Sequence, residues 1–213
     1  MKLTIVYDNE VKRPGLIADW GFSCLIEAQN MPQILFDTGA TGSILRHNMN
    51  EVGVDPGNIG IVIISHPHGD HTGGLRDIIK ANEEVELYLP QSFREKILTK
   101  KITRIKEPLE IRHNIFTTGE LGGIEQSLVI NTDKGLLVVV GCSHPGVGNI
   151  LDAASRFGKI YGIIGGLHGF HNFKRLNGLP LICPCHCTQY KSEIKHLFPQ
   201  QYLECGAGLV LEL

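Results

Sequence analysis

The sequence predicts an α/β or α+β layered sandwich, in which helices cover β-sheets. Strand-like and helix-like segments are interspersed along the whole chain, and the second half echoes the element order of the first. No linker or low-complexity segment interrupts the 213 residues, of which 42% are hydrophobic and 20% are charged. We therefore expect one domain over residues 1–213.

The first elements are predicted to be strands. Lys2–Asp8, Gly21–Ala28 and Gln33–Asp37 are short, apolar and separated by polar turn residues, which is typical of a β-meander. Ser43–Val52 carries apolar residues at near-helical intervals and predicts a helix. The apolar strand Ile61–Ile64 follows and runs directly into the sequence SHPHGDHTGG.

The middle of the chain continues this alternation. We expect a helix over Leu75–Ala81, a strand over Glu86–Leu89 and a second helix over Gln91–Lys101. Ile124–Thr132 and Gly135–Gly141 are apolar segments joined by polar residues, and they predict a hairpin.

In the last part, Val147–Ala154 has apolar residues at positions i, i+3, i+4 and i+7, which predicts an amphipathic helix. A strand over Ile160–Ile164 and a helix over Tyr190–Phe198 follow. Gln201–Cys205 and Leu209–Leu213 are expected to be extended.

Composition restricts the classes of partner. The 20 Lys and Arg residues against 22 Asp and Glu residues give a net charge of -2, so no global cationic field favours nucleic acid or an anionic membrane. The apolar runs are far shorter than the roughly 20 residues of a membrane span, and residues 1–10 do not resemble an export signal. We expect a cytoplasmic protein that acts on a small molecule and binds neither nucleic acid nor membrane; its oligomeric state stays open.

Four potential metal ligands lie within six residues directly after the strand Ile61–Ile64. On a strand, His66, His68 and Asp70 would share one side and His71 would face away, so only a loop can bring all four together. Imidazole and carboxylate groups in this density favour zinc, with iron or manganese as alternatives.

Three motifs resemble the metallo-β-lactamase superfamily, and the resemblance covers nearly the whole chain. HxHxDH is matched in full by residues 66–71, LFDTG stands at residues 35–39, and GCSH stands at residues 141–144. The resemblance implies a four-layer αββα sandwich with a metal site at the edge shared by two sheets. YDN, WGFS, GGLH and CHCT look most like a smaller branch, whose members are often described as 7,8-dihydropterin-6-methyl-4-(β-D-ribofuranosyl)aminobenzene-5′-phosphate synthases or as ferredoxin-like metallo-β-lactamase proteins.

The resemblance also implies a set of site residues for one or two zinc ions. The first ion would be held by His66, His68 and His144, and the second by Asp70, His71 and His186. Asp70 would also orient a metal-bound hydroxide, and Asp37 would accept the outer N–H of a histidine ligand and so fix its tautomer.

One position departs from the superfamily pattern. Where a carboxylate usually bridges the two metals, this sequence has Gly165-Gly166-Leu167-His168. A neutral imidazole cannot bridge two ions as a carboxylate does, so the occupancy of the second site stays open. His168 is either a ligand or a catalytic group that meets substrate, and His171 is a candidate substrate contact.

The cysteines and a basic run are less specific. Cys183, Cys185 and Cys187 are poorly spaced for mutual disulfides, so we expect buried, reduced thiols, with soft metal or redox ligands as the alternative. The segment 94–106 contains six basic residues, from which Lys100 and Lys101 are candidate contacts for an anionic substrate.

These observations favour a metal-dependent hydrolase that uses a metal-bound hydroxide on a small anionic substrate, for which a phosphorylated pterin is one candidate. Two alternatives remain. One is a non-haem iron oxidoreductase of the same fold, and the other is a non-catalytic protein that binds a ligand through its metal.

Overall fold

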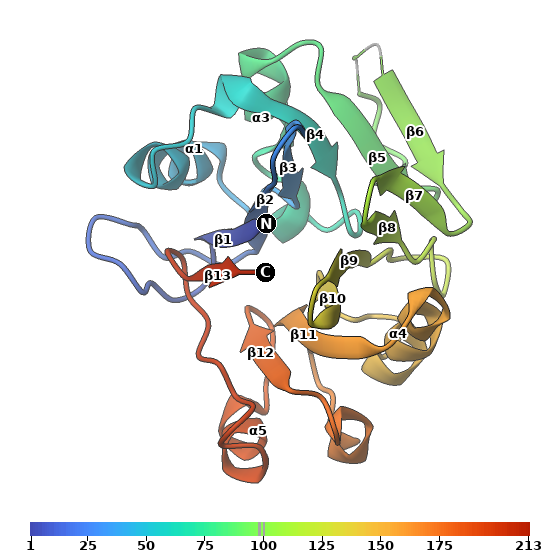
Figure 1. The fold of residues 1–213 in the computed structure, drawn as a ribbon. Helices are drawn as coiled ribbons and strands as arrows, with labels where there is room; N and C mark the ends of the chain where they lie inside the picture. The colour runs from blue at the N-terminus through green and yellow to red at the C-terminus, as the bar shows by residue number, and fades with distance from the viewer. Residues whose placement is uncertain (98, 100) are drawn as a thin grey trace.

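The computed structural model describes residues 1–97, 99 and 101–213, and its strands form two sheets (Figure 1). The first sheet has seven strands, in the order β13 (Val210–Glu212), β1 (Lys2–Tyr7), β2 (Ser23–Glu27), β3 (Gln33–Phe36), β4 (Ile59–Ile63), β5 (Glu86–Pro90) and β6 (Lys101–Ile105). The second has six, in the order β12 (Leu181–Cys185), β11 (Ile160–Gly166), β10 (Gly135–Val140), β9 (Leu128–Thr132), β8 (Ile115–Thr117) and β7 (Leu109–Arg112).

Helices connect the strands and lie outside the sheets. The α-helices are α1 (Gly42–Glu51), α2 (Gly69–Thr72), α3 (Leu75–Ala81), α4 (Val147–Ala154) and α5 (Lys191–Leu197). Short 3-10 turns span Pro56–Asn58, Ser155–Phe157 and Phe173–Leu176. Among the described residues, no helix has both the length and the apolar character that crossing a bilayer requires.

Pairing within each sheet follows the predicted order of elements. β1, β2 and β3 form the predicted antiparallel meander, after which β3, β4, β5 and β6 pair in parallel. β9 and β10 form the predicted hairpin, and β10, β11 and β12 are parallel. Because parallel strands end at the same edge of a sheet, the loops after β10, β11 and β12 emerge together.

Three hydrophobic cores hold four layers together. The central core lies between the two sheets and joins Ile5 and Phe36 of the first sheet to Ile130 and Val139 of the second. A second core packs α1 and α3 onto the outer face of the first sheet, and a third packs α4 and α5 onto the outer face of the second. The predicted αββα sandwich is thus confirmed (Figure 1).

Two predicted elements are wrong. Residues 91–97 form turns and bends rather than the start of a helix over Gln91–Lys101; residues 98 and 100 of that prediction lie outside the described residues, and Lys101 opens β6. Residues 201–205 form no strand and make only an isolated bridge between Tyr202 and Ile182. In the first case tertiary hydrogen bonds override local helical propensity, which is a weak preference: the Gln91 N–H donates to the Ile105 carbonyl, and the Ser92 N–H donates to Glu120 Oε1.

Candidate metal centre

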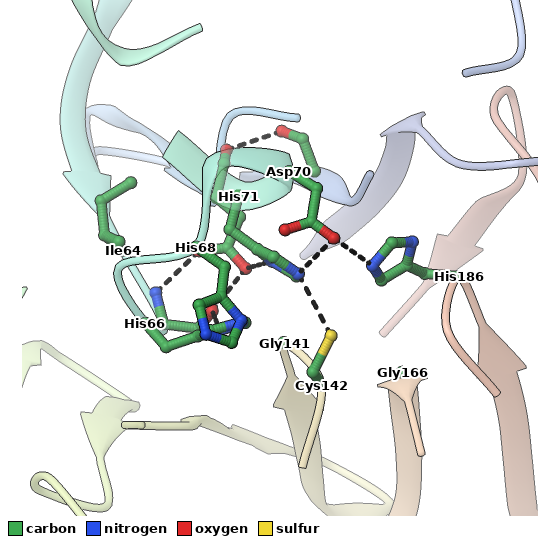
Figure 2. Close-up of polar contacts among 12 residues, drawn as sticks. Ile64, His66, His68, Asp70, His71, Gly141, Cys142, Gly166 and His186 are labelled. Atoms are coloured by element: carbon green, nitrogen blue, oxygen red, sulfur yellow. Dashed lines mark hydrogen bonds and ion pairs between the residues drawn. The ribbon is translucent and has the colours of Figure 1, made fainter. Parts of the chain in front are cut away.

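Loops at the carboxyl ends of β4, β10 and β12 bring the predicted metal ligands together where the two sheets meet. His66 and His68 lie in the loop after β4, whereas Asp70 and His71 lie in the short helix α2, so the prediction of a loop for all four is only partly correct. Figure 2 shows Asp70 and His71 pointing toward His186, which directly follows β12. Gly73 permits this turn, since a Cβ there would lie 1.9 Å from the carbonyl oxygen of Ala40.

The donor atoms form two adjacent groups. Within each group, every donor atom lies within 4.8 Å of the others; one group is His66, His68 and His144, and the other is Asp70, His71 and His186. His186 Nε2 is 3.2 Å from Asp70 Oδ2, and His71 Nε2 is 4.0 Å from the same oxygen. The structure therefore assembles the six predicted ligands from the segments after β4, β10 and β12 into the two sets that the resemblance implies.

A buried hydrogen-bond chain fixes the rings of His66 and His71. Asp37 is fully buried, and its Oδ2 accepts from His71 Nδ1 and from Ser65 Oγ, each at 2.7 Å. Since the Ser65 hydroxyl donates to Asp37, it accepts from His66 Nδ1 at 2.9 Å. Both Nδ1 atoms are thereby occupied, and both Nε2 atoms are left to face the site.

Residues near the N-terminus fix the orientation of the His186 ring through hydrogen bonds. Asn9 Oδ1 accepts from His186 Nδ1 at 3.0 Å, and the Asn9 amide donates to the His186 carbonyl at 3.1 Å. Asp8 is fully buried, and its Oδ1 accepts from the His186 backbone N–H at 2.8 Å. Burial raises the pKa of Asp8. Sequence reasoning quoted YDN only as a motif and did not assign it this positioning role.

Glu125 organises the loop that carries His144, and sequence reasoning missed it. Its carboxylate is fully buried and accepts four backbone N–H groups at 2.8–3.1 Å, those of Gly141, Cys142, Ser143 and His144. Burial raises the pKa of Glu125, while these N–H groups lower it. The loop after β10 is thus wrapped around one acidic side chain.

The donor set itself indicates that a cation fits. Nε2 of His66 and of His144 is buried and has no hydrogen-bond partner, which is costly unless a bound group satisfies it, and His186 Nε2 has only the Asp70 carboxylate beside it. The His186 ring holds the pKa of Asp70 well below its usual range, so that carboxylate is ionised. Neutral imidazoles beside a carboxylate are the ligands that zinc and other divalent transition metals prefer.

Burial and neighbouring rings shift the histidine pKa values in different directions. Burial and the His68 ring lower the pKa of His144 from 6.5 to about 4, and burial lowers the pKa of His66 further. For His71, burial lowers the pKa, but the carboxylates of Asp37, Asp70 and Glu125 together raise the value overall. His66 and His144 are therefore neutral at physiological pH, as ligation requires.

We expect the metal-free protein to lose stability as the pH falls from 6.5 to 4. In this window the folded state binds fewer protons at His144 than the unfolded state does, so stability rises with pH. His71 acts oppositely, because a raised pKa contributes stability that is lost as the pH rises. Urea denaturation of chelator-treated protein across this range should show a shallower pH dependence for His144→Ala. The exposed His196 is the control position, and an unchanged slope in His144→Ala would contradict the assignment.

A cavity of about 330 Å³ opens beside the first group. It is lined by residues of the loops after β10 and β11, among them His144, His168, Phe170 and His171. The His168 ring is exposed, with its centroid 5.3 Å from that of His144, and it is not part of either donor group. Both His168 and His171 therefore face the space where a substrate would sit.

Lys100 and Lys101 of the basic run were predicted to contact an anionic substrate. Lys100 lies outside the described residues. Lys101 pairs with Glu86, the first residue of β5, and Glu86 pairs with Ile61 of β4. Lys101 therefore lies at the end of the sheet where β5 and β6 begin. The histidine loop follows the opposite end of β4. This position does not favour a contact between Lys101 and substrate, and that contact stays a prediction.

The cysteines divide into three kinds. Cys185 and Cys205 form a disulfide with Cα atoms 5.4 Å apart, so the prediction of reduced thiols is wrong for Cys185. The spacing argument considered only its near neighbours, while Cys205 arrives from a distant segment beside β12. Cys24 and Cys183 are free, buried thiols in the central core.

Cys142 and Cys187 lie at the metal-ligand cluster itself. Cys142 Sγ is 3.2 Å from His71 Nε2, as the dashed line in Figure 2 marks. A hydrogen bond from Cys142 lowers the pKa of the Cys187 thiol to about 5. Sequence reasoning singled out Cys187 only as a neighbour of His186, and it read Cys142 only as part of GCSH.

Trp20 covers one side of the second group. Its indole Nε1 donates to Asp70 Oδ2 at 2.9 Å, and its ring centroid lies 4.8 Å from that of His186. The side chain is nevertheless 57% exposed. An exposed aromatic ring beside metal ligands offers a surface on which a flat substrate can stack.

The αββα layers and the cluster of histidines and carboxylate define a protein built to bind divalent metal. The chain belongs to the metallo-beta-lactamase superfamily, whose family model matches residues 21–143. A curated relative is the 7,8-dihydropterin-6-methyl-4-(beta-D-ribofuranosyl)-aminobenzene-5'-phosphate synthase of Methanocaldococcus jannaschii, which is 28% identical over 86% of this chain and 85% of its own length.

Solved structures share the fold over the full chain. Tm1679, described as a metal-dependent hydrolase of the beta-lactamase superfamily, has a TM-score of 0.77 and 25% identity, covering 100% of this chain and 99% of its own. Zn(2+)-bound PqqB from Methylobacterium extorquens has a TM-score of 0.59 and 13% identity, with 100% coverage of both chains, and shows likeness of fold alone.

Proposed function

We propose that the protein is a metallohydrolase with two adjacent divalent-metal sites, zinc being the ion that the ligands favour. His66, His68 and His144 hold the first ion, and Asp70, His71 and His186 hold the second. The observation that carries this proposal is the convergence of six donor atoms, among which the buried Nε2 atoms of His66 and His144 have no hydrogen-bond partner, and a bound cation satisfies both of them.

A divalent ion at this site lowers the pKa of bound water toward about 7 and polarises a carbonyl or phosphoryl oxygen. The chain's own residues supply orientation and proton handling. Asp70 accepts a hydrogen bond from Trp20 on Oδ2, and its carboxylate orients the attacking water. His168 stands exposed at the cavity beside His144, where its imidazole can donate a proton to the leaving group.

We propose a small substrate that carries a phosphate group. Its anionic end would accept hydrogen bonds from His168 and His171, which line the cavity, and a flat ring would stack on the exposed face of Trp20. The name of the relative from Methanocaldococcus jannaschii contains both a pterin and a phosphate, which supports the same class. That relative is called a synthase, so its name does not tell which bond of the substrate this chain breaks or forms, and the substrate panel below tests this.

Purified protein tested for metal content and for turnover checks the proposal. The substrate panel comprises phosphomonoesters, phosphodiesters, thioesters and a phosphorylated pterin. We expect zinc-dependent hydrolysis that falls by at least roughly 100-fold in Asp70→Ala and in His71→Ala, since removal of one transition-state stabiliser typically costs about 10²–10³-fold.

The control is His196→Ala, which changes an exposed histidine in the last turn of α5 and should keep full activity. Full activity in Asp70→Ala and His71→Ala would reject the assigned site. Stoichiometric iron together with oxygen uptake would instead favour an oxidoreductase.

A further inference from the structure

The region between the two ligand groups contains thiols in place of the bridging carboxylate of the superfamily pattern. β11 ends in Gly165-Gly166, and the His168 side chain lines the outer cavity, so this strand brings no carboxylate to the ions. The side chains of Cys142 and Cys187 lie there instead, 4% and 8% exposed. Neither thiol has a task in the hydrolytic mechanism above.

Donor distances place Cys142 beside two members of the second group, His71 and His186. Its Sγ is 3.2 Å from His71 Nε2, and it forms one close set with His66 and His71 and another with His186 and Cys187. Zinc bonds of about 2.0 Å to nitrogen and about 2.3 Å to sulfur, at a tetrahedral angle, separate the two donors by about 3.5 Å. His71 and Cys142 thus already stand close to the separation that a shared ion imposes.

We propose that Cys142 is a thiolate ligand of the ion held by Asp70, His71 and His186; this inference rests on the proposed function. Four protein ligands then close the second site, as in structural zinc sites. The first site keeps three protein ligands and so leaves a position open, and the cavity lined by His144 and His168 lies beside this site. The two ions therefore differ in role: the second holds the loops together, and the first meets substrate.

The backbone around Cys142 is built to hold the thiol in this place. The Cys142 N–H donates to Glu125 Oε1 at 3.0 Å, which fixes the loop rigidly. Gly166 leaves the room for the neighbouring thiol, since a Cβ there would lie 2.6 Å from Cys187 Sγ. On metal binding the Cys142 S–H bond breaks, its proton goes to solvent and its sulfur electron pair forms the bond to the ion.

Cobalt substitution tests the ligand directly without an activity assay. Metal-free protein is loaded with Co²⁺, and the near-ultraviolet spectrum is inspected for a thiolate-to-cobalt charge-transfer band. We expect this band in the wild type and its loss in Cys142→Ser, together with at least about 100-fold weaker binding of one of two Co²⁺ ions, because loss of even an outer partner of a ligand costs roughly 10–100-fold.

Controls remove the other free thiols. Cys24→Ser and Cys183→Ser lie in the central core and should retain the band, and so should Cys187→Ser. A band that persists in Cys142→Ser, or that vanishes in Cys187→Ser, overturns the assignment. If Cys142→Ser does not fold, a triple variant lacking Cys24, Cys183 and Cys187 must retain the band, and its loss there overturns the assignment.

The failure of this inference is distinguishable from failure of the proposed function. Two bound Co²⁺ ions without a charge-transfer band overturn the thiolate ligand and leave the hydrolase proposal standing. A wild type that binds no Co²⁺ overturns both. X-ray absorption of the zinc form is an independent test. We expect one sulfur ligand at about 2.3 Å for every two zinc ions. A coordination shell that contains nitrogen and oxygen but no sulfur contradicts the inference.

Discussion

Glu125→Ala should lower the free energy of unfolding by at least about 4 kcal/mol and abolish metal binding at the first site. The substitution leaves four buried backbone N–H groups without an acceptor, and each costs roughly 1–3 kcal/mol. His144 loses its anchor at the same time, because its own N–H donates to Glu125 Oε2 at 2.8 Å. Urea denaturation and metal analysis measure the two effects.

Glu125→Gln separates the two contributions. The amide oxygen at the Oε1 position still accepts from three N–H groups, while the NH₂ group faces the His144 N–H as a second donor. We expect a smaller loss of about 1–3 kcal/mol, with metal binding at the first site weakened rather than lost.

Glu120→Ala is the matched control, since Glu120 Oε1 accepts a single backbone N–H, that of Ser92, at 2.7 Å. It should destabilise the protein far less than Glu125→Ala does. Equal losses in the two alanine variants would show that Glu125 does not organise the loop.

Much of the sandwich was predictable because its elements carry their own periodicity. The amphipathic spacing over Val147–Ala154 coincides with α4, since one face of that helix meets the third core. The β1–β3 meander was predictable from apolar segments bounded by polar turns. In contrast, β6 is an exposed edge strand whose only buried residue is Ile105, so its pattern carries a weak strand signal, and its first residue, Lys101, was assigned to the preceding helix.

The ligands themselves were predictable because metal chemistry restricts residue type and spacing within HxHxDH. The residues that orient the ligand side chains were harder to predict from the sequence, since each is a single polar residue whose hydrogen-bond partner is distant in the chain. Asn9 stands 177 positions from His186, and nothing in the local sequence distinguishes Glu125 from a surface glutamate. Only the folded structure shows that Glu125 is surrounded by backbone N–H groups.

Asp37→Asn should weaken metal binding at the second site by about 10–100-fold, through the tautomer of His71. Asp37 Oδ1 accepts from the Ser65 N–H and Oδ2 accepts from His71 Nδ1, each at 2.7 Å. An amide offers one acceptor only. If its NH₂ group faces His71, Nδ1 must accept, and the proton moves to Nε2, where it blocks ligation. If the NH₂ group faces Ser65 instead, it and the Ser65 backbone N–H are two donors that face each other without an acceptor in a fully buried environment.

The asparagine variant isolates this effect from backbone strain. Asp37 has a φ of 59°, and asparagine tolerates this left-handed conformation as aspartate does, so the chain path is preserved. Competition titration with a chromophoric zinc chelator measures the two affinities separately. We expect the first site to weaken as well, because the same Asp37 Oδ2 accepts from Ser65 Oγ, which in turn accepts from His66 Nδ1. Asp55→Asn, which changes an exposed capping carboxylate before residues 56–58, is the control and should bind both ions normally. Wild-type affinity at both sites in Asp37→Asn would mean that the carboxylate does not set the His71 tautomer.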